Sequence, residues 1–233
     1  MTQIDNNSNA MIEMIKVSKE YTPDVTALEN ISLSIARGEM FFLIGRSGAG
    51  KTTLLKLLCS METPSKGLIE IDGISTEKLR GHNLSKLRQK IGVAYQDFKL
   101  LLDRTVAENI AISMEVSYKK PQFIQKRVRT LLEKLDLSDK YNTIAGDLSR
   151  GEQQRVTLAR SIANSPTMIL VDEPTGNLGM ATTTRVMELL DSCHKSGATI
   201  VIATHDESLY ANSPHRVMEL SEGRVISMTG GLL

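Results

Sequence analysis

The 233-residue sequence contains no tryptophan, and aromatic residues make up only 4% of it. Such a composition argues against a surface that stacks the bases of single-stranded nucleic acid. The charges are balanced, with 28 Lys and Arg against 27 Asp and Glu, so the basic excess typical of duplex-binding proteins is missing. Composition therefore gives no reason to expect DNA, RNA or an anionic bilayer surface as a partner.

Cysteines and long apolar segments are also scarce. The two cysteines, Cys59 and Cys193, show no metal-type spacing, which argues against a disulfide framework or a zinc site. No apolar run approaches the roughly 18–20 residues that span a bilayer. Residues 1–10 are polar, lack the basic and apolar regions of a signal peptide, and are expected to form a flexible tail. These absences predict a soluble protein of the reducing cytoplasm.

Short apolar segments alternate with helical patterns along the chain. Strands are predicted at residues 11–17, 31–35, 40–44, 68–71, 91–95, 168–171 and 198–203, helices at residues 51–59, 121–137, 149–164 and 181–195, and a final hairpin at residues 215–228. Apolar strands that alternate with helices predict an α/β fold with a parallel sheet covered on both faces. The length suits one large domain or two small ones, and the pattern favours one domain over residues 11–233 with a helical subdomain at about residues 85–160.

A glycine-rich segment joins the predicted strand at residues 40–44 to the helix that follows it. It matches the P-loop pattern G-x-x-x-x-G-K-[ST] and comprises Gly45, Arg46, Ser47, Gly48, Ala49, Gly50, Lys51 and Thr52, with Thr53 next in the helix. Main-chain N–H groups of such a loop face phosphates. Lys51 is expected to reach the β- and γ-phosphates, and Thr52 to bind Mg²⁺. A turn that only closes the packing is the alternative, which the flanking strand and helix disfavour.

Two carboxylates and a histidine follow predicted strands. Asp172 and Glu173 end the apolar segment before Pro174, and His205 follows the strand at residues 198–203. Ligands of open α/β sheets bind at the carboxyl ends of the strands. We therefore expect Asp172 to hold Mg²⁺ and Glu173 to polarise the hydrolytic water. A helix cap and a structural histidine are the alternatives, and the P-loop upstream favours catalysis.

Residues 148–154, which read Leu-Ser-Arg-Gly-Glu-Gln-Gln, resemble the LSGGQ signature of ABC ATPases. Read without the family, Ser149 and Glu152 form a capping box, and a capped helix N-terminus is itself an anion site. The resemblance extends over residues 11–228. It implies the ABC-ATPase variant of the P-loop NTPase fold, with a mixed or parallel core sheet, an antiparallel β part and a helical signature subdomain.

The resemblance also implies roles for individual residues. Tyr21 would stack on adenine, and Gln96 would contact Mg²⁺ and relay the nucleotide state to a membrane subunit. Lys51, Glu173 and His205 would form the catalytic set, with His205 sensing the γ-phosphate.

The family further implies a head-to-tail homodimer with two ATP molecules at its interface. In that arrangement Ser149 and Gly151 of one chain complete the nucleotide site of the other.

Residues 95–109 and Glu152 most resemble the FtsE subfamily, whose members act with the membrane protein FtsX in bacterial cell division. An integral membrane partner similar to FtsX is therefore implied, with the chain bound peripherally at the cytoplasmic side of the inner membrane. ATPases of lipoprotein-release and of macrolide or solute export share much of residues 172–178 and are the alternative.

Two positions depart from the family pattern. Arg150 stands where the signature has glycine, and Gly179 replaces the usual aspartate of the D-loop. The Arg150 side chain could crowd the γ-phosphate or add a charge-assisted contact to it. Because the catalytic set is present, a slow ATPase is expected, with a nucleotide-gated scaffold as the alternative. A DNA-repair ABC ATPase is disfavoured, since the roughly hundred residues between P-loop and signature leave little room for its usual insert.

Overall fold

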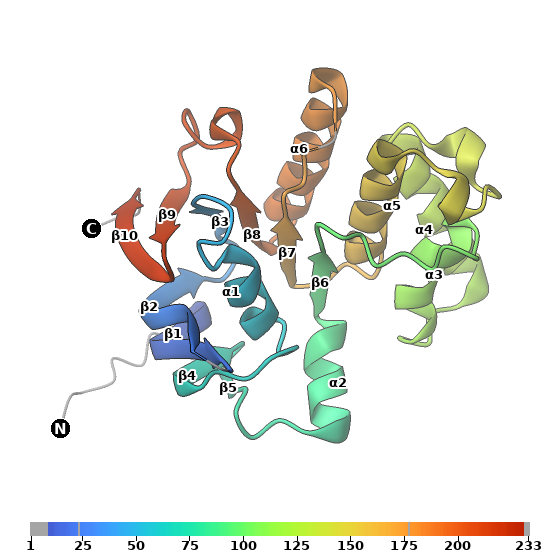
Figure 1. The fold of residues 1–233 in the computed structure, drawn as a ribbon. Helices are drawn as coiled ribbons and strands as arrows, with labels where there is room; N and C mark the ends of the chain where they lie inside the picture. Colours follow the sequence, from blue (N-terminus) through green and yellow to red (C-terminus); the bar gives the residue numbers. More distant parts are fainter. Residues whose placement is uncertain (1–8, 23, 177, 231–233) are drawn as a thin grey trace.

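The computed structural model describes residues 9–22, 24–176 and 178–230. Its strands are β1 (Ala10–Tyr21), β2 (Val25–Ala36), β3 (Met40–Ile44), β4 (Lys66–Ile71), β5 (Ile74–Ser75), β6 (Ile91–Ala94), β7 (Met168–Asp172), β8 (Thr199–Thr204), β9 (Arg216–Ser221) and β10 (Arg224–Thr229). Its α-helices are α1 (Lys51–Leu58), α2 (Gly81–Gln89), α3 (Val106–Glu115), α4 (Pro121–Lys134), α5 (Arg150–Ile162) and α6 (Met180–Lys195). Figure 1 shows how they are arranged.

The large sheet has the order β10-β9-β3-β8-β7-β6, and all its strands except β10 run parallel. Alternate residues of its central strands face opposite cores. Phe42 and Ile169 pack with helices α3–α6, whereas Phe41 and Leu170 pack with α1 and the second sheet. Because both faces are covered, the strands are apolar throughout rather than alternating. The predicted parallel sheet is confirmed.

The predicted C-terminal hairpin is confirmed as β9 and β10, with Ser221 paired to Arg224. Glu222 and Gly223 both have positive φ angles, 49° and 75°, as in the tight turns that match the strand twist. A Cβ on Gly223 would lie 2.7 Å from the Ala27 carbonyl oxygen. Glycine is therefore required by both the turn and its contact with β2.

The second sheet is antiparallel, with the order β2-β1-β4-β5. Its inner face, which includes Ile12, Met14 and Leu33, packs in the same core as α1. The sequence places β1, β2 and β4 correctly but misses the short β5 and makes β1 and β2 too short, because polar residues such as Lys19 and Asn30 interrupt their apolar patterns. The predicted tail falls mostly on residues 1–8, which lie outside the described residues, and Ala10 already belongs to β1.

Helices α3, α4 and α5 group together at the β6 side of the molecule (Figure 1). They share a core that includes Ile110, Leu131 and Val156. Residues 85–94 of the range predicted for a helical subdomain instead form the end of α2 and strand β6, which pairs with β7 in the large sheet. Helices α2 and α3 were not predicted, although α3 begins with a capping box, for which Thr-x-x-Glu is the sequence pattern.

Within the described residues, no helix combines the length and apolar character needed to cross a bilayer.

Candidate nucleotide site

The P-loop runs from the end of β3 into the first two residues of α1, Lys51 and Thr52, in the position that the sequence predicts. Gly45, Gly48 and Gly50 have φ angles of 145°, 80° and 107°. A Cβ on Gly45 would come within 2.3 Å of the Leu220 carbonyl oxygen, and one on Gly50 within 2.6 Å of the Ala27 carbonyl oxygen. The loop can therefore wind tightly beside β2 and β9 only with glycine at these positions.

The ammonium group of Lys51 is buried within this loop. Its Nζ donates a hydrogen bond to the Gly45 carbonyl at 2.6 Å and lies 3.4 Å from the Arg46 carbonyl oxygen. The same Nζ is 3.6 Å from Oε1 of Glu173. Main-chain oxygens and a carboxylate thus surround the cation, so that it is held at the phosphate loop rather than extended into solvent.

A hydroxyl and a carboxylate from opposite halves of the chain meet beside the lysine. Thr52 Oγ1 donates to Asp172 Oδ2 at 2.8 Å. Burial raises the pKa of the Asp172 carboxyl above its usual range, and the hydrogen bond from Thr52 partly opposes this effect. Two oxygen groups of this kind suit a small divalent cation.

Both the main chain and the side chain of Glu173 make hydrogen bonds. Its Oε1 lies 2.8 Å from Nδ1 of His205, and its Oε2 accepts from Thr204 Oγ1 at 3.2 Å. Its N–H donates to the Ala203 carbonyl at 2.8 Å, and its carbonyl accepts from Gln154 Nε2 at 2.7 Å. The β7–β8 register pairs Asp172 with Ala203, which brings Glu173 and His205 side by side.

These groups border a cavity of about 520 Å³. Its lining comprises Val25, Thr26, Ala27, the P-loop from Arg46 to Thr53, Gln96, Asp172, Glu173 and His205. The structure thus brings together most of the residues that the sequence predicts for the site. Val25, Thr26 and Ala27 were missed because nothing in their pattern sets them apart from an ordinary strand.

Tyr21 does not line this cavity, although the family resemblance implies that it stacks on the adenine. It ends β1 and pairs directly with Val25, which does line the cavity. Its hydroxyl donates to Glu62 Oε2 at 2.5 Å, and Lys19 Nζ lies 5.0 Å from its ring centroid. Tyr21 therefore lies next to the cavity, on the antiparallel sheet, and its hydroxyl is hydrogen-bonded to Glu62.

The signature residues Ser149 and Gly151 lie at the start of α5 and also do not line the cavity of their own chain. Ser149 caps the helix through the predicted capping box with Glu152. The guanidinium of Arg150, which replaces the signature glycine, lies 5.8 Å from the ring centroid of Phe98 in the same chain. Gly179, at the D-loop position, is the N-cap of α6.

A P-loop after β3, an acidic pair at the end of β7 on the far side of β8, and a separate capped signature helix together define the ATP-binding cassette. The ABC transporter family matches residues 28–176. The chain belongs to this family and is an ABC-type ATPase that binds ATP.

Within the family the chain is FtsE-like. It is 43% identical over 217 residues to the cell division ATP-binding protein FtsE of Mycobacterium tuberculosis, covering 93% of this chain and 94% of that protein. It is 41% identical to FtsE of Escherichia coli K12, covering 92% and 97% of the two chains. Among solved structures, the dimeric post-hydrolysis state of the ATP-binding cassette MJ0796, bound to ADP and Pi, has a TM-score of 0.90. That structure is 33% identical, and the match covers 94% of this chain and 98% of the other.

Proposed function

We propose that this protein hydrolyses Mg-ATP as a homodimer and drives an FtsX-like integral membrane partner in bacterial cell division. It would act peripherally, on the cytoplasmic side of the inner membrane. The observation that carries the proposal is the position of Glu173, whose carboxylate lies between His205 and Lys51 at the cavity. Support for the cellular role comes from the relatives in M. tuberculosis and E. coli, both named as cell division proteins.

In the proposed reaction, the P-loop N–H groups and Lys51 bind the phosphates of ATP. Glu173 orients a water molecule and takes its proton as the water attacks the γ-phosphorus, and ADP leaves with the β–γ bridging oxygen. His205 donates to the γ-phosphate and restrains Glu173. The products are ADP and inorganic phosphate, and the proton taken by Glu173 is released to solvent.

The hydroxyl–carboxylate pair of Thr52 and Asp172 fits Mg²⁺, with Gln96 as a further oxygen ligand at the cavity wall. Within the described residues, no three His, Cys, Asp or Glu side chains gather into a metal site. A site with few protein ligands suits Mg²⁺, which usually keeps water and phosphate oxygens in its shell. When bound, the ion would neutralise charge on the phosphates.

The nucleotide site would be completed by a second copy of the chain. Ser149 and Gly151 stand apart from their own cavity, at a helix N-terminus suited to an anion. The structurally similar cassette MJ0796 is described as dimeric. Tyr21 would stack on the adenine from its place beside Val25.

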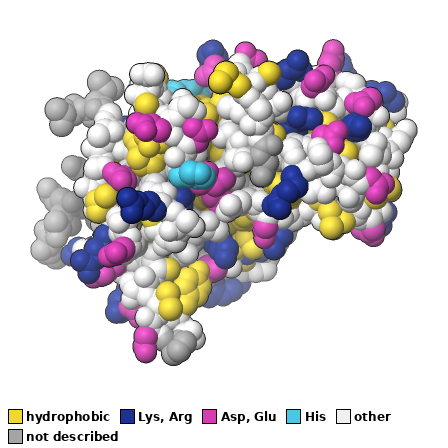
Figure 2. Space-filling model, turned by 45° about the horizontal axis from the view of Figure 1, so that its top comes forward, with side chains coloured by type: hydrophobic (Ala, Val, Ile, Leu, Met, Phe, Trp, Pro, Cys, Tyr) yellow, Lys and Arg dark blue, Asp and Glu magenta, His cyan; other side chains and the backbone are white. Residues whose placement is uncertain are grey.

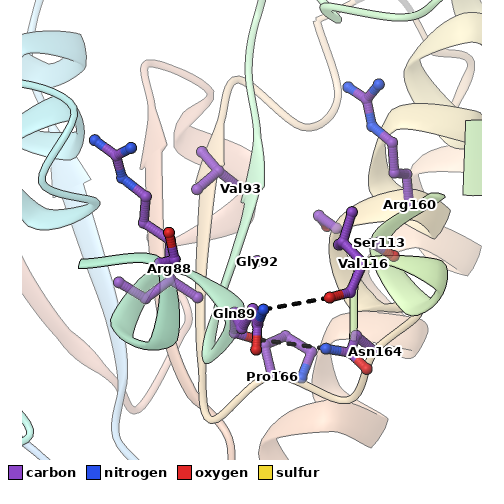
Figure 3. Close-up of a pocket in the computed structure, with 12 residues that line it drawn as sticks. Arg88, Gln89, Gly92, Val93, Ser113, Val116, Arg160, Asn164 and Pro166 are labelled. Atoms are coloured by element: carbon purple, nitrogen blue, oxygen red, sulfur yellow. Dashed lines mark hydrogen bonds between the residues drawn. The ribbon is translucent and has the colours of Figure 1, made fainter. Parts of the chain in front are cut away.

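For the membrane partner we propose the groove of about 430 Å³ between the sheet and the helices (Figure 3). Arg88 and Gln89 come from α2, Val93 from β6, and Val116 from the end of α3. Gln89 bridges the two sides by donating to the Val116 carbonyl at 3.4 Å. The segment that contains Gln96 connects β6 of the large sheet to helix α3. A partner bound in this groove would contact both the sheet and the helices, and would therefore respond when one moves relative to the other.

Isolation of the membrane complex tests this function. Tagged Glu173→Gln protein, incubated with Mg-ATP to hold the ATP-bound state, would be recovered from detergent-solubilised native membranes and its partners identified by mass spectrometry. We expect an FtsX-like protein with few membrane spans and an extracytoplasmic domain. Recovery of a lipoprotein-release or export permease instead would contradict the cell-division role while leaving the ATPase chemistry intact.

A further inference from the structure

The signature helix α5 contacts the catalytic carboxylate residue of its own chain through one buried side chain. Gln154 is 8% exposed and donates from Nε2 to the Glu173 carbonyl oxygen at 2.7 Å. Within the described residues this is the only hydrogen bond of its side-chain amide, since Oε1 has no partner there. The bond is therefore a direct polar link between the signature helix and Glu173.

Glu173 has a main-chain conformation that its surroundings must maintain. Its φ angle is 52°, in the left-handed region that residues with a Cβ rarely adopt. Such conformations persist at functional sites when neighbouring contacts determine them. Three of the contacts come from the end of β8, through Ala203, Thr204 and His205. The bond from Gln154 comes instead from helix α5 and holds the main chain of Glu173, whereas Lys51 of α1 contacts only the carboxylate.

We infer that Gln154 is a positioning residue for Glu173. By holding the Glu173 carbonyl, Gln154 sets the orientation of the peptide that follows this residue and, through it, the direction of the carboxylate. The inference rests on the proposed role of Glu173 in hydrolysis. Because Gln154 itself does not line the cavity, it acts on the reaction step and not on nucleotide binding.

The neighbouring residue on the same helix provides a matched control. Gln153 also donates from Nε2 to a main-chain carbonyl, that of Ala145, at 3.1 Å. Replacing either glutamine with leucine removes one amide-to-carbonyl hydrogen bond from α5. Only the Gln154→Leu variant loses the bond to Glu173, so a difference between the two variants isolates the positioning effect.

The experiment measures steady-state ATP hydrolysis and nucleotide affinity for the full chain and both variants. Loss of one hydrogen bond that orients the reacting group predicts a kcat about five- to tenfold lower for Gln154→Leu. The ATP KM and the Kd for ATP should stay within about twofold of the unmodified protein, as the cavity itself is unchanged. Gln153→Leu should keep its kcat. Equal kcat values for the two variants, or a parallel rise in KM for Gln154→Leu, would overturn the inference.

Hydrogen exchange provides a readout that does not depend on turnover. Amides of residues 171–176 should exchange faster in nucleotide-free Gln154→Leu protein and remain unchanged in Gln153→Leu protein. Unchanged exchange would overturn the positioning role even if the protein is an active ATPase. An inactive unmodified protein with the expected exchange difference would instead count against the proposed function alone. Should Gln154→Leu fail to fold, Gln154→Met removes the same donor with an unbranched side chain of similar size.

Discussion

The two halves of the proposed nucleotide machinery are held in different ways. Lys51, Asp172 and Glu173 are 7%, 4% and 9% exposed and are bonded within one constellation at the sheet edge. Ser149 and Arg150 are exposed at the start of α5, where their contacts are with Glu152 and Phe98 of their own segment and its neighbour. The chemical half, formed by Lys51, Asp172 and Glu173, is thus already assembled within one chain. The signature half, formed by the start of α5, leaves its anion-binding helix N-terminus exposed. A nucleotide site shared between two chains requires this arrangement, because the exposed N-terminus of α5 in one chain must reach the nucleotide bound by the other.

Removing the carboxylate that we propose as catalytic should impair the chemical half most severely. Glu173→Gln retains the size of the side chain but cannot accept the proton of the attacking water, so ATP turnover should fall by about 10²- to 10⁴-fold. ATP binding, followed with a fluorescent nucleotide, should persist. Glu133→Gln, at an exposed position of α4, is the control and should keep full turnover. A Glu173→Gln variant that hydrolyses ATP normally would assign catalysis to another group.

Mixing two inactive variants should show whether the halves come from different chains. Glu173→Gln damages the chemical half, and Ser149→Arg blocks the signature half. In a mixed head-to-tail dimer one site receives both defects and the other receives none. An equal mixture should therefore recover about a quarter of the unmodified turnover, since half of the dimers are mixed and each has one intact site. Absence of any recovery would contradict the head-to-tail arrangement.

Substitution in the groove of Figure 3 should separate the membrane partner from the chemistry. Val116→Glu introduces a charge that would be buried under the partner, so we expect partner recovery to fall at least about tenfold. The ATPase rate of the isolated protein should not change. Ile226→Glu, on β10, is a matched control because Val116 and Ile226 are both 57% exposed. Equal loss of partner in the two variants would mean that the groove is not the docking site.

The smallest effect is expected at the residue that departs from the signature. In Arg150→Gly, loss of the guanidinium contact with Phe98 should lower the free energy of unfolding by about 0.5–1 kcal/mol. Turnover should change by less than about threefold, because the side chain is directed toward its own chain. Chemical denaturation and steady-state assays check the two expectations. A large gain in turnover would show that Arg150 crowds the γ-phosphate of the partner's nucleotide.

The balanced charges of the composition can be compared with one face of the molecule. On the face shown in Figure 2, basic and acidic side chains are interspersed. A strong attraction of polyanions would need basic side chains gathered on one side. Composition predicts a small net charge because 28 basic and 27 acidic residues nearly cancel, although their arrangement on the surface is decided by the fold.

Local sequence determined the P-loop, the strands of the large sheet and the cap of the signature helix. Each depends on residues close together in the chain: glycines at fixed spacing, short apolar runs, and a serine three residues before a glutamate. Helix α2 was missed because its apolar residues are few, and only Leu87 is buried. The start of the helical part was placed too early because periodicity does not show that β6 pairs with β7.

Only the tertiary structure decided how the site is assembled. Thr52 and Asp172 are 120 residues apart in the chain, and Glu173 and His205 are 32 apart, yet each pair is 2.8 Å apart in space. The register of parallel strands sets these distances, and no local pattern encodes a register between segments so far apart. The bond from Gln154 to Glu173 likewise depends on how α5 packs against the sheet. The sequence thus predicted which groups would carry the chemistry, and packing decided which of them touch.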